Sequence, residues 1–218
     1  MNDDEVHLWH ARVPPSSFDE TLAGVRLVLT PAEIVTAMRF RDESHRVLYA
    51  FSHALLRTLL ARYLGREPVI VATRNGKPEL ADRALRFNLS HTDGHVLVGI
   101  TRTADLGVDI ENHDTRNDEV ARMVFTPEEL RTPMDFCERW TRKEAFAKAR
   151  GEGLSIDLQR FAFTPELSCD FDDASAWSFH TFRPGDECRA SAAVRMRNVR
   201  WIVRTVPSPR DAGRGDCV

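Results

Sequence analysis

The chain has 218 residues, of which 42% are hydrophobic and 29% are charged, and its formal net charge is −3. This ordinary globular composition excludes a disordered chain, a collagen and a small disulfide scaffold. The slightly acidic balance provides no global basic field for nucleic acid. Residues 1–5 do not resemble a secretory signal, and no apolar run reaches the roughly 18 residues of a membrane helix. We expect a cytoplasmic protein whose scattered cysteines are reduced thiols: Cys137, Cys169, Cys188 and Cys217.

The first predicted element is a strand over residues 6–13. Residues 30–33, Thr-Pro-Ala-Glu, form a helix start in which the threonine caps the helix and the glutamate closes a capping box. A long helix is expected over residues 44–64, because its apolar residues keep helical spacing and Gly65 follows as a C-terminal cap.

The next predicted elements are strands over residues 69–73, 85–90, 95–101 and 106–111. A second helix start with a capping box follows at residues 126–129, and a second long helix is expected over residues 137–150. Residues 161–206 alternate as strands do, and residues 207–218 are predicted to be a loose tail.

Two segments of the chain are alike. Residues 29–34 and 125–130 share the Thr-Pro-x-Glu pattern at an offset of 96 residues. This indicates an internal duplication, with chance recurrence of a common helix start as the alternative. We therefore predict an α/β (α+β) fold built as a pseudo-dimer of two similar halves, residues 1–103 and 104–206.

A pair of acidic residues lies in the predicted strand Gly-Val-Asp-Ile-Glu at residues 107–111. In a strand, Asp109 and Glu111 point to one face and their apolar neighbours point to the other. Hard carboxylate oxygens at this spacing suit Mg²⁺, which keeps its other positions for water and phosphate. The alternative is an edge strand with two solvated acids.

The second long helix carries further charged residues. Trp140, Glu144 and Lys148 are four residues apart and share one helix face. Glu144 can act there as a third acidic ligand or a base, and Lys148 as a cation for phosphate. The alternative is a surface ion pair of small energetic value. Lysine is rare in this arginine-rich chain and occurs only as Lys77, Lys143 and Lys148, which indicates positions that need a compact ammonium group.

Two loops and strand ends carry candidate anion-binding groups. Ser90 and His91 end the predicted strand Phe-Asn-Leu-Ser-His-Thr, and Lys77 lies on a tight Gly-Lys-Pro turn. Adjacent Ser and His side chains on a strand point to opposite faces, and no Gly-x-Ser-x-Gly motif surrounds Ser90, which argues against nucleophilic catalysis. Phosphate binding stays an open interpretation for Ser90, His91 and Lys77, and a plain loop without a ligand is the alternative at Lys77.

In chain order, the motifs GKP, FNLSHT, GVDIE, FTPEEL and WTRKEAFAKARGEGLS resemble the 4′-phosphopantetheinyl transferases of the long, surfactin-synthetase-activating type. The resemblance covers residues 30–155. It implies a two-lobed α/β pseudo-dimer that transfers the phosphopantetheine arm of coenzyme A to a serine of an acyl or peptidyl carrier protein. The other product is 3′,5′-ADP, and the reaction would depend on Mg²⁺, with Mn²⁺ as the alternative. A cytoplasmic monomer is expected.

The resemblance also implies site residues. Asp109, Glu111 and Glu144 would hold the metal, Glu144 would also be the base for the carrier serine, and Lys148 would steady the pyrophosphate. The implied contacts to coenzyme A are Arg46, Lys77, Ser90, His91, Asp109 and Lys148. Arg39 and Arg41 are expected to replace lysines that the family carries in the first half.

An acidic carrier requires local positive charge on its docking face. The expected docking residues are Arg116, Arg122, Arg139 and Arg142 together with Met123 and Val124. Two other functions use the same residues: a magnesium-dependent hydrolase of a nucleotide pyrophosphate, and a non-catalytic module that binds carriers. The class of carrier, from fatty acid, polyketide or peptide synthesis, stays open.

Overall fold

The computed structural model describes residues 1–206 apart from 114–117, 153–155, 165, 170 and 172, so the predicted tail lies outside the described residues. The first part of the fold consists of β1 (Glu5–Arg12), α1 (Phe18–Val25), α2 (Pro31–Arg39), α3 (Glu43–Leu64), β2 (Ile70–Ala72), β3 (Pro78–Leu80), β4 (Arg86–Thr92) and β5 (His95–Thr101). The second part consists of β6 (Leu106–Asn112), α4 (Asp118–Val124), α5 (Pro127–Arg131), α6 (Phe136–Arg150), β7 (Phe161–Phe163), β8 (Leu167–Cys169), β9 (Ser178–Gly185), β10 (Cys188–Val194) and β11 (Arg200–Thr205), with 3₁₀ turns at Leu158–Arg160 and Ala174–Ala176.

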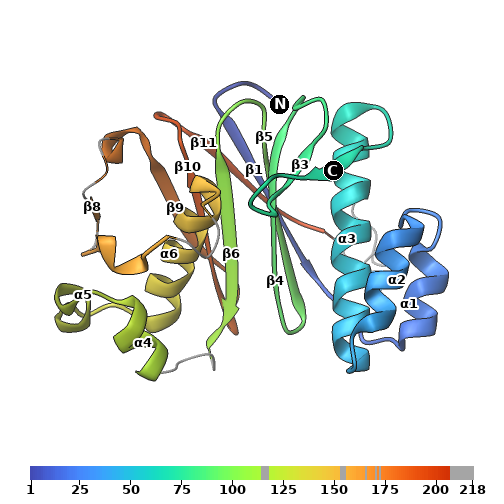
Figure 1. Cartoon of the computed structure of the whole chain (residues 1–218), viewed down its shortest axis with the longest axis horizontal. Coiled ribbons are helices and arrows are strands. Elements are labelled where there is room, and N and C mark those ends of the chain that lie inside the picture. The colour runs from blue at the N-terminus through green and yellow to red at the C-terminus, as the bar shows by residue number, and fades with distance from the viewer. Residues whose placement is uncertain (114–117, 153–155, 165, 170, 172, 207–218) are drawn as a thin grey trace.

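These elements form a mixed α/β fold of four layers, helix on sheet on sheet on helix (Figure 1). Helix α3 packs on one face of a sheet ordered β11-β1-β5-β4. Helix α6 packs on a second sheet, ordered β6-β10-β9. The inner faces of the two sheets meet across a core that includes Leu8, Leu97, Val108 and Ile110. The predicted α/β class is confirmed.

The two sheets repeat one topology. In each, the first strand pairs antiparallel with the third, and the third pairs antiparallel with the second, which gives β1-β5-β4 and β6-β10-β9. An internal duplication predicts this repetition. Strand β11 is not part of this repeat. It lies near the end of the described chain but pairs in parallel with β1, at the edge of the first sheet. The proposed division at residue 103 remains a prediction.

The two predicted helix starts are present. Thr30 and Thr126 each accept a hydrogen bond from the backbone N–H of the third helical residue, and the glutamate carboxylate there accepts one from the backbone N–H of the cap residue. Both long helices end at a glycine in the left-handed conformation, Gly65 with φ 68° and Gly151 with φ 69°. A side chain at such a position would be strained, so these glycines stop α3 and α6 where the sheets end.

The structure adds elements that the sequence reasoning missed, namely α1, α4 and the short strand β3. Helix α1 carried a readable signal, because Ser17 and Glu20 form a complete capping box before it. Strand β3 is three residues long and, within the described part of the chain, pairs only with β2, so its pattern is too short to recognise. Among the described residues, no helix is both long and apolar enough to cross a membrane.

Candidate active site

The two sheets are joined by side chains along neighbouring edge strands. Asn88, Ser90 and Thr92 occupy alternate positions of β4, and each reaches β6. The Asn88 side-chain oxygen accepts a hydrogen bond from the Val108 backbone at 2.8 Å, and Ser90 donates one to Asp109 at 2.9 Å. Thr92 donates one to Glu111 at 3.2 Å. The Phe-Asn-Leu-Ser-His-Thr motif therefore fixes both acidic residues of β6 against the first sheet.

Gly107 sets the distance between β6 and α6. A β-carbon at this position would lie 2.0 Å from the Ala145 carbonyl oxygen and 2.4 Å from the Ala149 backbone nitrogen. Only a glycine allows the helix backbone to approach the strand this closely. Ala145 and Ala149 each follow a charged residue, Glu144 and Lys148, so the same contact places those two side chains over the strand.

We expect Gly107→Ala to lower both stability and activity. The added methyl must push α6 away from β6, which costs about 1–3 kcal/mol of unfolding free energy and shifts Glu144 and Lys148 relative to Asp109. A displacement of about 1 Å at reacting groups lowers kcat/KM by about 10²-fold. Gly24→Ala is the matched control, since nothing lies within 4 Å of a β-carbon there. Unchanged unfolding and kinetics in Gly107→Ala would contradict this account of the glycine.

One face of α6 lies along the acidic strand. The Trp140 indole nitrogen donates a hydrogen bond to Glu111 at 3.4 Å, and the Lys148 ammonium lies 2.5 Å from Asp109 Oδ1. Lys148 also donates to Ser90 Oγ at 3.1 Å. Glu144 lies one turn from each of these helix residues, so the predicted shared face of Trp140, Glu144 and Lys148 is confirmed.

The negative charge of the carboxylates in this cluster is only partly compensated by Lys148. Asp109 is only 3% exposed, and its Oδ2 is buried with no hydrogen-bond partner. Burial, and then repulsion from Asp109, raise the pKa of both Glu111 and Glu144 above the ordinary carboxyl value, against an opposing effect of Lys148. Crowded acids with an unpaired buried oxygen indicate a place for a further cation.

The donor set fits a hard divalent cation, since it consists of carboxylate oxygens with an unpartnered one on Asp109. The oxygens of these three carboxylates are not all within 4.8 Å of one another. Among the described residues, two other sets of ligand atoms meet that distance, His10–His95–Cys188 and His113–Asp135–Cys137. Metal binding by Asp109, Glu111 and Glu144 therefore remains a prediction.

A family model for the 4′-phosphopantetheinyl transferase superfamily matches residues 105–194. The 4′-phosphopantetheinyl transferase HetI of Nostoc sp. is 35% identical over 210 residues, which cover 88% of this chain and 88% of the relative. The chain belongs to the 4′-phosphopantetheinyl transferase superfamily. A phosphopantetheinyl transferase of Thraustochytrium sp. is 30% identical over 87% of this chain and 78% of its own length. The transferase Sfp of Bacillus subtilis is 28% identical over 62% of this chain and 65% of its own length. The predicted resemblance and the enzyme class are confirmed.

Lys77, predicted from the transferase resemblance to contact coenzyme A, has its ammonium against the protein backbone. Nζ donates to the carbonyls of Leu106 at 3.1 Å, Lys148 at 2.7 Å and Ala149 at 3.3 Å. An ammonium has three hydrogens, so these bonds use all of its donors. Burial lowers the pKa of this lysine. The geometry supports a positioning role, in which the β2–β3 turn holds the end of α6.

A pocket of about 240 Å³ lies between this turn, β4 and the end of α6. It is lined by Asn75, Gly76, Lys77, Pro78, Asn88, Leu89, Lys148 and Gly151. Ser90, predicted with Lys77 as a coenzyme contact, holds Asp109 and Lys148. Burial of the imidazole, followed by the positive charge of His53 and of Lys148, lowers the pKa of His91.

The other predicted coenzyme contacts of the transferase lie beside α3. Arg46 is half-buried and donates to the backbone carbonyls of Phe40 at 2.8 Å and Arg41 at 3.3 Å, so it shapes the turn between α2 and α3. Arg39 and Arg41 are exposed. Their contacts to coenzyme A stay predictions, as does that of Arg46.

Lys143, inside the transferase motif, is structural in this fold. It is completely buried and pairs at 2.8 Å with Glu129, which is also completely buried. Its ammonium donates to the carbonyls of Val124, Leu158 and Phe161. Lys143 therefore ties α4, α5 and the start of β7 to α6. Of the three lysines, Lys148 is the one whose ammonium contacts a predicted metal ligand.

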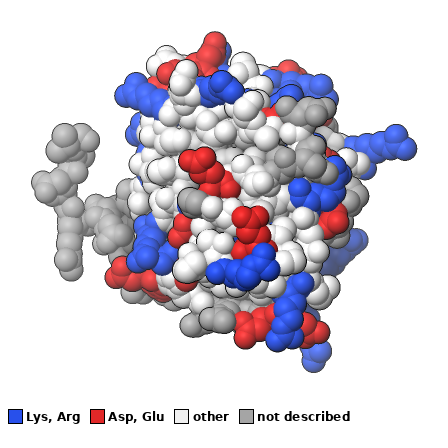
Figure 2. All heavy atoms as spheres, turned by 90° about the vertical axis from the view of Figure 1, so that its left-hand side faces the viewer, with Lys and Arg blue, Asp and Glu red and all other residues white. Residues whose placement is uncertain are grey.

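The expected docking residues differ in their availability. Arg139 is 4% exposed and donates to the Thr132 carbonyl, and Arg142 contacts Thr181 and Glu138, whereas Arg122 and Met123 are exposed. Arg116 lies outside the described residues. On the side where α5 and β8 lie in Figure 1, the visible basic side chains alternate with acidic ones (Figure 2). The charge visible on this face is mixed.

Proposed function

We propose that this transferase moves the 4′-phosphopantetheine arm of coenzyme A to a serine of an apo acyl or peptidyl carrier protein. The serine oxygen attacks the phosphorus of the arm, and the bond from that phosphorus to the leaving 3′,5′-ADP breaks. The serine proton passes to a carboxylate of the enzyme. The observation that supports this most strongly is the unpartnered buried Asp109 Oδ2 beside two carboxyls of raised pKa.

Asp109, Glu111 and Glu144 would hold Mg²⁺, with Mn²⁺ as an alternative, because both ions accept oxygen ligands. Such an ion supplies positive charge to the pyrophosphate oxygens in the transition state. The protein's own contribution is positioning. Ser90 and Lys148 hold one oxygen of Asp109, and Lys148, whose side chain is 31% exposed, can also meet a phosphate.

Glu144 is the proposed base for the carrier serine. A serine hydroxyl is a weak nucleophile at neutral pH, and a positioned carboxylate contributes about 10²–10⁴-fold by accepting its proton. The raised pKa of Glu144 suits this role, because a base acts best when its pKa approaches the working pH. Glu111 is less free, since Trp140 and Thr92 each donate to one of its oxygens.

Residues 1–103 would mainly bind coenzyme A, and residues 104–206 would hold the metal and receive the carrier. The pocket beside Lys148, with His91 on the outer side of β4, supports a coenzyme site where the two sheets meet. The exposed Arg122 and Met123 support a docking face on α4. The cytoplasmic location and the monomeric state belong to the same proposal.

Incubation with coenzyme A, Mg²⁺ and a panel of apo carriers tests the proposal. We expect a mass gain of one phosphopantetheine arm on the carrier serine and release of 3′,5′-ADP. Chelation should abolish the gain, and Asp109→Asn should lower its rate by about 10²–10³-fold. Glu128→Gln is a suitable control, because Glu128 is exposed on α5.

The alternatives give different results. A pyrophosphate hydrolase would consume coenzyme A without labelling any carrier. A module that only binds carriers would neither label them nor consume coenzyme A. Full activity of Asp109→Asn would contradict the metal assignment but leave the transfer reaction standing.

A further inference from the structure

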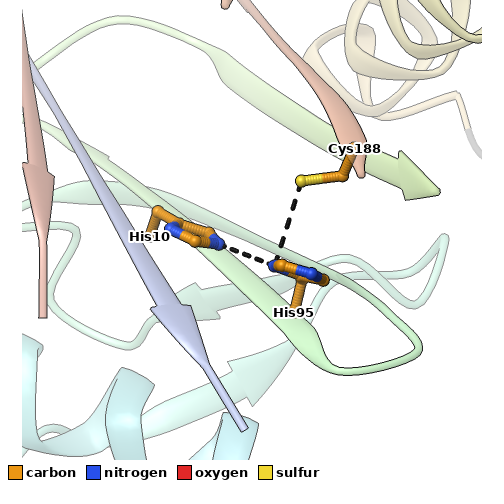
Figure 3. Close-up of side chains that lie close together, drawn as sticks. All are labelled: His10, His95 and Cys188. Carbon is orange, nitrogen blue, oxygen red and sulfur yellow. Dashed lines mark hydrogen bonds between the residues drawn. The ribbon is translucent and has the colours of Figure 1, made fainter. Parts of the chain in front are cut away.

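A second group of ligand-type side chains lies between the two sheets, apart from the carboxylates. His10 of β1, His95 of β5 and Cys188 of β10 point toward one another at one end of the core between the sheets (Figure 3). They are 2%, 3% and 0% exposed. Buried polar groups cost free energy unless they are partnered, so this cluster at the edge of an apolar core needs an explanation.

The partnering within the cluster is incomplete. His10 Nε2 lies 2.9 Å from His95 Nδ1, and Cys188 Sγ lies 3.9 Å from the same nitrogen. His10 Nδ1, the ring nitrogen that does not contact His95, is buried and has no hydrogen-bond partner. A neutral imidazole offers a ring nitrogen as a metal ligand, and it is the commonest metal ligand in proteins.

We propose that His10, His95 and Cys188 bind a zinc ion that clamps the two sheets together. Imidazole nitrogen and thiolate sulfur are the ligands that Zn²⁺ prefers, whereas Mg²⁺ takes oxygen. In a tetrahedral zinc site two nitrogens lie about 3.3 Å apart, and nitrogen and sulfur about 3.6 Å apart. The observed 2.9 Å and 3.9 Å differ from these values by a few tenths of an ångström. The ligand atoms of all three residues already lie within 4.8 Å of one another.

A carboxylate supports the site from outside. Glu187 Oε2 lies 4.0 Å from His95 Nε2, the ring nitrogen that faces away from the cluster. At this distance Glu187 makes no hydrogen bond to His95, but its negative charge favours a cation at the histidine. Glu187 also pairs with Arg12, which reduces the repulsion that this arginine exerts on an incoming cation. The side chains of Glu187 and Arg12 are 56% and 62% exposed, so the cluster lies directly beneath the surface.

The other set of three ligand groups is less suitable. His113 Nε2 lies 2.6 Å from an Arg189 nitrogen, and the Asp135 side chain caps α6. Arg189 Nε also lies 4.0 Å from Asp135, so a guanidinium already occupies the position of a cation. Cys137 Sγ contacts the Asn112 and His113 carbonyls. This set therefore provides a control that contains a second buried thiol.

Zinc binding would change the protonation of one group. The Cys188 thiol would lose its proton to solvent, and the sulfur would bond to the metal as thiolate. Both imidazoles would stay neutral. Each zinc ion bound would therefore release one proton near neutral pH.

Cobalt titration of the chelator-treated full chain tests the site, because Co²⁺ substitutes for Zn²⁺ and reports a thiolate ligand by a charge-transfer absorption. We expect this absorption to saturate at one equivalent and to disappear when Zn²⁺ is added. Cys188→Ser should abolish it, and Cys137→Ser should keep it. Zn²⁺ should also raise the Tm of the unmodified chain.

Two results would overturn the proposal. One is the absence of the thiolate absorption from the unmodified chain, and the other is its survival in folded Cys188→Ser. Proton release on adding Zn²⁺ to the unmodified chain gives an answer that does not depend on how the variants fold. Release of one proton per zinc supports thiolate ligation, and release of none excludes it.

Discussion

Glu144→Gln is expected to lower the rate of phosphopantetheine transfer by about 10²–10⁴-fold, because the amide cannot accept the proton of the carrier serine. The substitution keeps the shape of the side chain, so the binding of coenzyme A should change much less than kcat. Initial rates measured at several coenzyme A concentrations, with saturating carrier, separate the two effects. A variant that keeps full kcat would show that Glu144 is not the base.

The same substitution is expected to stabilise the metal-free fold at neutral pH. Burial and repulsion from Asp109 raise the pKa of Glu144 in the folded state, so the native chain binds this proton more tightly than the unfolded chain does. Stability is therefore lost as the pH rises from the unfolded pKa through the higher folded pKa. Glutamine removes the charge, so the stability gain of the variant should appear above this window and vanish below it.

Denaturant unfolding at acidic and neutral pH in the presence of a chelator measures this difference. Glu111 retains its own raised pKa, so part of the pH dependence should persist in the variant. Glu128→Gln again serves as the exposed control and should match the unmodified chain at both pH values. Equal stability of Glu144→Gln and the unmodified chain at neutral pH would contradict the proposed crowding of the carboxylates.

Lys143→Met is expected to lower the unfolding free energy by about 3–5 kcal/mol, because it removes the ammonium that pairs at 2.8 Å with the fully buried Glu129 and leaves only the more distant Arg139, at 4.0 Å. Methionine fills a similar volume, so lost packing contributes little. The carbonyls of Val124, Leu158 and Phe161 also lose their donor. Denaturant unfolding of the purified variant gives the change directly.

Two further variants separate charge from packing and from catalysis. Adding Glu129→Gln to Lys143→Met removes the poorly compensated carboxylate charge and should recover part of the loss, with the three carbonyls still unpaired and Arg139 without its carboxylate partner. Lys148→Met should show the opposite pattern, with lost transfer and a smaller loss of stability, since Lys148 is 31% exposed and adjoins Asp109. Stability of Lys143→Met equal to that of the unmodified chain would exclude the structural role.

Much of the architecture follows from local patterns that can be recognised in the sequence. The capping boxes at Thr30 and Thr126 and the glycines after both long helices depend on interactions within a few residues, so their spacing is sufficient to place α2, α3, α5 and α6. The alternation in residues 107–111 likewise predicts which side chains share a face. Helix α1 had the same kind of signal at Ser17.

The contacts that assemble the site depend on residues far apart in the chain. Asn88 reaches β6 from β4, and the close approach of α6 explains why residue 107 must be glycine. The roles of the three lysines could not be predicted from their sequence neighbours either. Their charge suggested a chemical role for each, yet Lys77 and Lys143 donate hydrogen bonds to backbone carbonyls, and only Lys148 among them contacts Asp109.

By itself, therefore, the sequence determined the capped starts of α2 and α5, the glycine stops of α3 and α6, the α/β class and the shared face of Asp109 and Glu111, because short-range hydrogen bonding and side-chain periodicity control these features. Only the tertiary structure decided that β11 returns to β1, that Lys143 is buried, and that His10, His95 and Cys188 meet. The packing of one sheet on the other brings together residues that are far apart in the chain, and their spacing in the sequence does not predict that they are in contact.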